Sequence, residues 1–204
     1  MNDWDRSKRQ FDMQHGGDLA RAIQRDLVVS AQRGDTASFE ALVRRHVDRL
    51  YGAARLMLRD TDLAEDAVQQ ALIRTWKDIR SLRDPDRFEP WLHKLLVRAC
   101  YDEARRRRRW LAEVPALAVV ETGAVDAALG ERDLIERAFR SLSPEHRAVL
   151  VLHFYLDLTP ADIAIRLDLP GGTARSRLHY ALAGLRAAIE AGERGGGLRT
   201  GTLA

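Results

Sequence analysis

The stretch from residue 158 to residue 178 constrains the fold of this chain more than any other. Thr159-Pro160 precedes a short apolar segment, and Pro170-Gly171-Gly172-Thr173 precedes a longer one. A hydroxyl residue followed by proline is a typical helix start, because the hydroxyl caps free amides and proline fits the first turn. The pattern therefore predicts two helices joined by a tight turn, with the glycines allowing the turn and Thr173 capping the second helix.

The second of these helices begins with small, polar and basic residues. Such a helix start fits the major groove of DNA, where arginine can bind guanine through two hydrogen bonds. The alternative is a helical hairpin with a solvated basic face, because helix-turn-helix patterns also arise by chance in helical proteins. The residues expected to contact DNA are Thr173, Arg175, Ser176, Arg177 and His179.

Apolar residues recur at three- and four-residue spacing along most of the chain, and no strand-like alternation persists. We therefore predict an all-α fold with two small helical domains, at residues 26–109 and 131–190, joined by a flexible linker at 110–130. Residues 1–25 are expected to form a mobile N-terminal extension and residues 191–204 a disordered tail.

Composition excludes several classes of protein. Cys100 is the single cysteine, so no intramolecular disulfide can form, and the six histidines lack metal-ligand spacing. Neither a nucleophile motif nor a cofactor motif is present, so we expect no catalytic site, no metal and no cofactor. The N-terminus lacks the apolar core of a signal peptide and no apolar run could span a membrane, which predicts a cytoplasmic protein without membrane insertion.

A predicted helix near residue 62 carries five polar residues on one side. Asp62 and Glu65 match an N-cap and N3 pair for its start. Clustered carboxylates could bind a metal, and a polar helical face could bind a protein. From the residues alone, a solvated face with a favourable charge at the helix dipole is the preferred interpretation. The five residues are Asp62, Glu65, Asp66, Gln69 and Gln70.

Positive charge is concentrated at the end of the first predicted domain. Five consecutive arginines occupy residues 105–109, and Lys94 and Arg98 precede Arg105 along the same predicted helix. Such runs are often only solvated. Because like charges repel and a DNA-binding motif lies elsewhere in the chain, phosphate contact is the favoured interpretation.

Three aromatic residues flank a proline-containing loop at residues 80–90. Aromatic side chains beside a basic loop can stack on unpaired bases, but at helical spacing they more often belong to the core. We expect Trp76 and Trp91 to be core residues and leave Phe88 open between the two roles. Cys100 is expected to be a small buried hydrophobic residue.

Together these motifs resemble two conserved regions of the bacterial sigma factors. The motifs resembling the second region are residues 62–69, Trp76, residues 88–92, Asp102 and the arginine run. The motifs resembling the fourth region are residues 142–150, 158–164 and 170–178. With only these two regions and a short linker, the chain resembles the extracytoplasmic-function (ECF) class.

The resemblance implies an alternative sigma factor, which is a promoter-specificity subunit of RNA polymerase without its own catalytic site. Its implied partners are core RNA polymerase, through the clamp helices and the flap, promoter DNA, and an anti-sigma factor. The five polar residues from Asp62 to Gln70 would then dock on the clamp helices. The fourth region would read the minus-thirty-five duplex with the helix-turn-helix residues named above.

The second region would capture opened bases of the minus-ten element. Binding of extruded bases favours melting without any bond chemistry. Arg98 stands where the family commonly has asparagine, so the polar contact there differs. The residues implied in this role are Arg80, Arg83, Phe88, Arg98, Arg105 and Arg106.

Two other classes of function fit the sequence less well. A stand-alone helix-turn-helix repressor or activator would need a dimer interface, and no spare apolar helix is evident. A metal-dependent nuclease using Asp62, Glu65 and Asp66 would lack the basic or histidine partner expected nearby.

Overall fold

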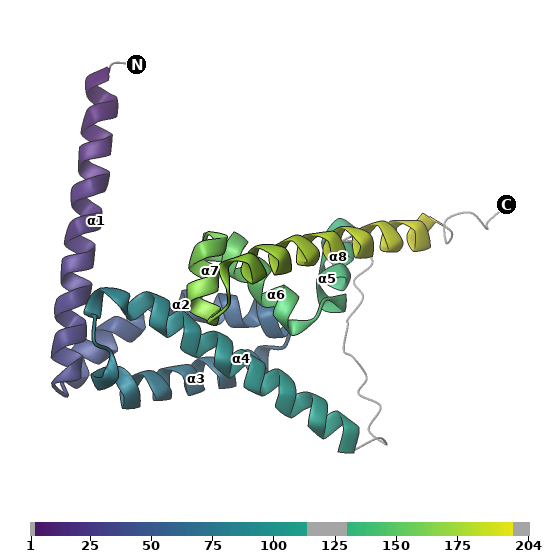
Figure 1. The fold of residues 1–204 in the computed structure, drawn as a ribbon, viewed down its shortest axis with the longest axis horizontal. Coiled ribbons are helices and arrows are strands. Elements are labelled where there is room, and N and C mark those ends of the chain that lie inside the picture. Colours follow the sequence, from purple (N-terminus) through teal and green to yellow (C-terminus); the bar gives the residue numbers. More distant parts are fainter. Residues whose placement is uncertain (1–2, 114–129, 198–204) are drawn as a thin grey trace.

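The computed structural model describes residues 3–113 and 130–197, and over these ranges the chain is helical without any strand (Figure 1). This confirms the predicted all-α class. The first four helices are α1 (Asp3–Gln32), α2 (Thr36–Leu58), α3 (Thr61–Asp78) and α4 (Phe88–Glu113). The others are α5 (Gly130–Ser141), α6 (Pro144–Leu150), α7 (Pro160–Leu167) and α8 (Gly171–Gly197), with a π-helical turn at Val151–Tyr155 after α6.

Capping side chains set where the helices begin. The Thr159 side chain accepts a hydrogen bond from the backbone amide of Asp162. The Asp162 carboxylate in turn accepts a hydrogen bond from the backbone amide of Thr159, so the capping box at α7 is complete. The N-cap of α3 is Asp60, whose carboxylate accepts a hydrogen bond of 3.1 Å from the backbone amide of Leu63. The sequence spacing had suggested Asp62 for this role. Asp62 lies in the first turn instead, where its charge still suits the helix dipole.

The helices extend beyond several of the predicted domain limits. α1 begins at Asp3, upstream of residue 26, and α4 continues to Glu113 into the range predicted as linker. Most of that predicted linker, residues 114–129, lies outside the described residues. α8 is helical to Gly197, past residue 190, and residues 198–204 also lie outside the described part of the chain.

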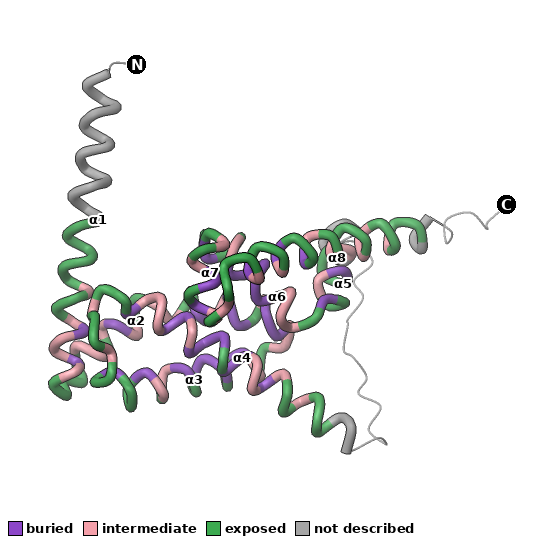
Figure 2. The backbone as a smooth tube through the Cα atoms, in the orientation of Figure 1, coloured by how far each residue is buried: buried purple, intermediate pink, exposed green. Residues whose placement is uncertain are grey.

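The first domain is built around α2, α3 and α4, each of which buries one side (Figure 2). α3 turns Ala64, Ala67 and Val68 inward. Cys100 is 1 % exposed on α4, and burial raises the pKa of its thiol to about 12, so it is the inert core residue that was expected.

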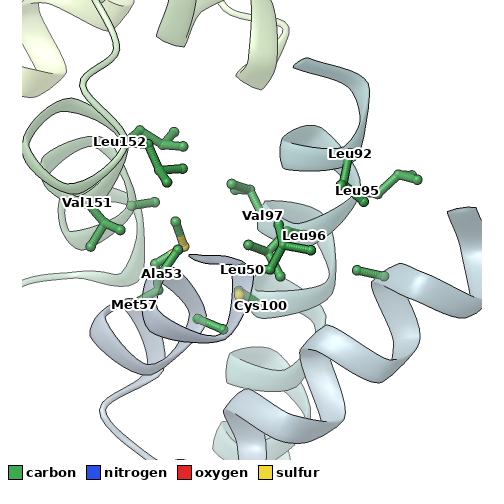
Figure 3. Close-up of a cluster of buried hydrophobic side chains, with 14 of the residues drawn as sticks. Leu50, Ala53, Met57, Leu92, Leu95, Leu96, Val97, Cys100, Val151 and Leu152 are labelled. Carbon is green, nitrogen blue, oxygen red and sulfur yellow. The ribbon is translucent and has the colours of Figure 1, made fainter. Parts of the chain in front are cut away.

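The two domains pack against one another through one hydrophobic cluster (Figure 3). Leu50 and Met57 from α2 lie beside Val97 from α4, and Val151 and Leu152 of the π-helical turn close the cluster from the second domain. The sequence predicted two helical domains joined by a flexible linker, without a contact between them. Burying both apolar faces together removes more surface from water, which is the physical reason for the contact.

Gly52 of α2 lies directly against Tyr155 of the second domain. A Cβ atom at this position of α2 would lie only 2.1 Å from the hydroxyl oxygen of Tyr155. Only glycine lets the α2 backbone come this near to the tyrosine ring. Nearby, Arg59 at the C-cap of α2 forms an ion pair of 2.7 Å with Glu136 of α5.

Candidate nucleic-acid interface

The polar face of α3 is exposed as the helical spacing predicted. Its five residues lie on the side opposite the buried alanines and valine of the same helix. Asp66 forms an ion pair of 3.1 Å with Arg106 of α4, so this face borders the arginine run. The exposed set is Asp62, Glu65, Asp66, Gln69 and Gln70.

Trp76, expected in the core, is 39 % exposed on α3. The neighbouring Thr75 takes the buried position and donates its hydroxyl hydrogen bond to the carbonyl of Ala71 at 2.7 Å. Trp76 instead packs against Phe39, with ring centroids 4.8 Å apart. The expectation was wrong because one residue of shift around a helix moves a side chain by 100°, from the core to its edge.

The aromatic residues around the loop also differ from their expected roles. Phe88 is 1 % exposed at the start of α4, with its ring centroid 5.7 Å from that of His46, so it is a core residue and has no free face for a base. Trp91, also expected in the core, is half-buried and packs against the edge of the core. Arg80 and Arg83 are exposed on the loop.

Most of the basic residues of α4 are exposed, but carboxylates neutralise several of them. Arg105 donates a hydrogen bond of 2.6 Å to the carboxylate of Asp102, and this bond holds the pKa of that carboxyl below its usual range. Arg106 forms ion pairs with Asp66 and Glu103. Arg98 forms an ion pair of 3.1 Å with Asp168, which follows α7 in the second domain. Of the residues predicted to contact the minus-ten element, Arg98, Arg105 and Arg106 are therefore exposed on α4 but paired with carboxylates.

The helix-turn-helix forms at the predicted place, but its turn depends on a different residue. Asp168 adopts the left-handed conformation, with φ 52°, and the amide of Leu169 donates to the carbonyl of Ala164. Gly171 and Gly172 lie in the first turn of α8, with φ outside the left-handed region, and a Cβ on either would meet nothing within 4 Å. α8 starts before Thr173, whose expected capping role is therefore wrong.

The first turns of α8 present the predicted DNA-contacting face. Ala174, Leu178 and Ala181 are buried against the rest of the domain. The opposite side carries Arg175, Ser176 and His179, which are exposed, with Thr173 and Arg177 half-buried beside them. Tyr180, which was not among the predicted residues, is 64 % exposed next to His179. Only its place in the 3.6-residue period of the helix could have indicated it.

Comparison with known proteins places both domains in one family. Residues 42–110 match the family described as Sigma-70 region 2, and residues 138–187 match Sigma-70, region 4. The chain is 34 % identical over 169 residues to the ECF RNA polymerase sigma factor SigL of Mycobacterium tuberculosis, covering 80 % of this chain and 95 % of the relative. This chain belongs to the ECF sigma factors. It is also 31 % identical over 155 residues to the RNA polymerase sigma-E factor of Streptomyces coelicolor, covering 75 % and 86 % of the two chains.

Two solved structures share the fold. CnrH, solved in complex with the cytosolic domain of CnrY, superposes with a TM-score of 0.60 at 25 % identity, covering 83 % of this chain and 98 % of CnrH. RpoE of Bartonella quintana, solved with the anti-sigma factor NepR, gives a TM-score of 0.60 at 21 % identity, covering 74 % and 96 %. At that identity, the second likeness concerns the fold alone.

Membership in the ECF sigma factors establishes the role of the chain. It is an alternative sigma factor that directs promoter recognition, and it serves as a specificity subunit of RNA polymerase rather than as an enzyme. Within the described residues, no group of three or more His, Cys, Asp or Glu side chains could hold a metal ion. No helix in the described ranges is both long and apolar enough to cross a bilayer.

Proposed function

We propose that three surfaces divide the work of this ECF sigma factor: the exposed polar face of α3, the basic side of α4, and the first turns of α8. The observation that supports this division is the exposure of each predicted set opposite a buried side of the same helix. The face on α3 binds the clamp helices of core RNA polymerase, through Asp62, Glu65, Asp66, Gln69 and Gln70.

The α8 surface reads the minus-thirty-five duplex in the major groove. Arg175 and Ser176 lie on the exposed side of the first turns, where side chains of a recognition helix reach base edges. Thr173, Arg177 and His179 complete this surface, and Tyr180 extends it. The flap of core polymerase binds the same domain.

The α4 surface and the adjoining loop hold the opened minus-ten strand. Arg98, Arg105 and Arg106 supply charge for phosphates, and Arg80 and Arg83 extend the surface along the loop. Phe88 is left out of this surface because it is buried. Arg98 is free to bind DNA only when its carboxylate partner in the second domain moves away.

An anti-sigma factor is the inferred regulator, and the cytoplasm the inferred location. The support comes from two structural relatives, one solved with an anti-sigma factor and the other with the cytosolic domain of a partner protein. Holding the two domains together would keep Arg98 paired and prevent simultaneous contact with both promoter elements.

Reconstituted transcription tests this division of work. The full chain is mixed with sigma-free core polymerase and promoter fragments that carry altered minus-ten or minus-thirty-five sequences. We expect initiation only with the protein present, with Arg98→Ala weakening open-complex formation on all promoters and Arg175→Ala weakening use of particular upstream sequences. Tight operator binding without core and without transcription would contradict the proposal.

A further inference from the structure

A cavity of about 900 Å³ lies where the second domain meets the first. Its walls come from α1, α2, the segment around Pro85 to Pro90, and α7, so both domains contribute. The volume is in the range of small-molecule sites. The charged residues in the walls are Arg21, Arg25, Arg45 and Arg166 against Asp86 and Glu89, an excess of two positive charges.

Arg166 is the most deeply buried of these four cations. It is 9 % exposed on α7, where Nη1 donates to the carbonyl of Asp162 at 3.2 Å and lies 3.5 Å from the carboxylate of that residue. The same carboxylate already accepts the hydroxyl of Thr159 at 2.6 Å. Nε of Arg166 is buried and has no acceptor within the described part of the chain. A buried guanidinium with an unsatisfied donor is costly unless an anion completes its environment.

His46, which also lines the cavity, is a second polar residue there, half-buried, with arginines nearby. Burial lowers the pKa of His46, and although Glu89 acts in the opposite direction, Arg45 and Arg49 lower it further. Nε2 of His46, which lines the cavity, is buried without a hydrogen-bond partner among the described residues. This nitrogen is therefore another polar group at the cavity that a ligand could satisfy.

The two carboxylates in the walls do not compensate Arg166. Asp86 forms an ion pair with Arg25 on the α1 side of the cavity. Oε1 of Glu89 lies 3.9 Å from Nε2 of His93, beyond hydrogen-bond distance. Over the described ranges, neither carboxylate forms an ion pair with Arg166.

We propose that this cavity binds a small anion bearing a diphosphate group, either free or as part of a phosphorylated small molecule. Arginine forks match phosphate oxygens in pairs, and the neutral ring of His46 adds a further polar contact. The volume exceeds what a single phosphate needs. Because Arg45 belongs to α2 and Arg166 to α7, the bound anion ties the second domain to the first and stabilises their contact.

Calorimetric titration of the full chain with inorganic pyrophosphate at low ionic strength tests this proposal. We expect saturable binding that Arg166→Gln and Arg45→Gln each weaken at least tenfold. Arg45→Gln changes an exposed residue and so separates loss of binding from loss of folding. Arg186→Gln, which removes an exposed arginine of α8 away from the cavity, is the matched control and should bind pyrophosphate as the parent does.

The other outcomes are equally definite. ADP binding with the same dependence on Arg45 and Arg166 supports the proposal and identifies the diphosphate as part of a nucleotide. Absence of saturable binding overturns it, as does an equal loss in the Arg186→Gln control. Displacement of pyrophosphate by a single-stranded oligonucleotide would assign the site to the DNA backbone instead. None of these measurements depends on core polymerase, so they are independent of the roles proposed above for α3, α4 and α8.

Discussion

Asp168 at the end of α7 binds Lys94 of α4, with 2.7 Å between its Oδ1 and Nζ. Its other carboxylate oxygen lies 3.1 Å from Nη2 of Arg98. Hydrogen bonding to Lys94 is the largest influence that holds the pKa of Asp168 below its usual range. The residue that makes the left-handed turn of the helix-turn-helix thus also connects the second domain to the proposed minus-ten surface, where its carboxylate occupies a place suited to a phosphate.

Asp168→Asn should free this surface. Asparagine tolerates the left-handed conformation, so the turn is preserved while the charge is lost. The affinity of the full chain for a minus-ten single-stranded oligonucleotide should rise up to about fivefold, since a partly exposed ion pair contributes about 1 kcal/mol at most. Fluorescence anisotropy without core polymerase measures it. Asp157→Asn is the matched control, because Asp157 is also exposed and has φ 54°. Equal affinities in both variants would contradict a role for Asp168.

Gly52→Ala should separate the domains. Alanine by itself stabilises a helix interior by about 1 kcal/mol relative to glycine. Here the added Cβ would overlap the Tyr155 hydroxyl, 2.1 Å away, so either the tyrosine ring or the contact between the domains must shift, and we expect the contact to open. Small-angle scattering should show a larger radius of gyration for the variant. Combining it with Tyr155→Ala should restore the parental radius, and a variant that stays as compact as the parent would show that the ring simply moves aside.

Arg175→Ala should alter promoter choice. Arg175 is exposed in the first turns of α8, so its loss removes a contact without disturbing the core. If it binds a base edge, binding to the preferred minus-thirty-five sequence should weaken by about 1–3 kcal/mol, with other sequences little affected. Competition binding on duplexes differing at single positions measures this. Arg186→Ala is the control, and a uniform loss on every sequence would identify a phosphate contact instead.

Asp66→Lys should weaken association with core polymerase. The substitution reverses charge at the centre of the exposed α3 face and also places a cation beside Arg106, its present partner. Pull-down of core polymerase by the full chain measures the effect. Glu190→Lys, an exposed charge reversal on α8, is the control. Unchanged association would return the α3 face to the solvated interpretation.

Stability should fall as the pH drops below about 6.5. His93 is 2 % exposed, and burial lowers its pKa to about 3, with Arg166, His46 and Arg49 adding to the effect. Because the folded-state pKa is below the unfolded value, the unfolded chain binds the extra proton between about pH 6.5 and pH 3, and stability is lost across that window. The loss due to His93 is at most about 1.4 kcal/mol per pH unit.

Urea unfolding between pH 7 and pH 5 measures this effect, above the range where most carboxylates titrate. His93→Gln should show a shallower decline than the parent, because one of the titrating groups is gone. His179→Gln, at an exposed position on α8, should decline as the parent does. Identical slopes for His93→Gln and the parent would contradict the burial of a neutral His93.

Local sequence signals determined the helices and the faces of this protein. Thr159 and Asp162 specify their capping box within four residues, and the 3.6-residue period placed Asp66 outside and Ala67 inside on α3. These relationships join residues one turn apart, so the sequence displays them directly.

The tertiary structure decided what depends on distant segments. Nothing local indicated that Phe88 would be buried, that Thr75 would displace Trp76 from the core, or that Asp168 would bind α4. Lys94 and Asp168 are separated by 74 positions in the chain, and their contact exists because the apolar sides of α2, α4 and the π-helical turn share one core. Burial of that common surface is a property of the assembled domains, whereas each helix with its polar face is a property of its own short stretch of sequence.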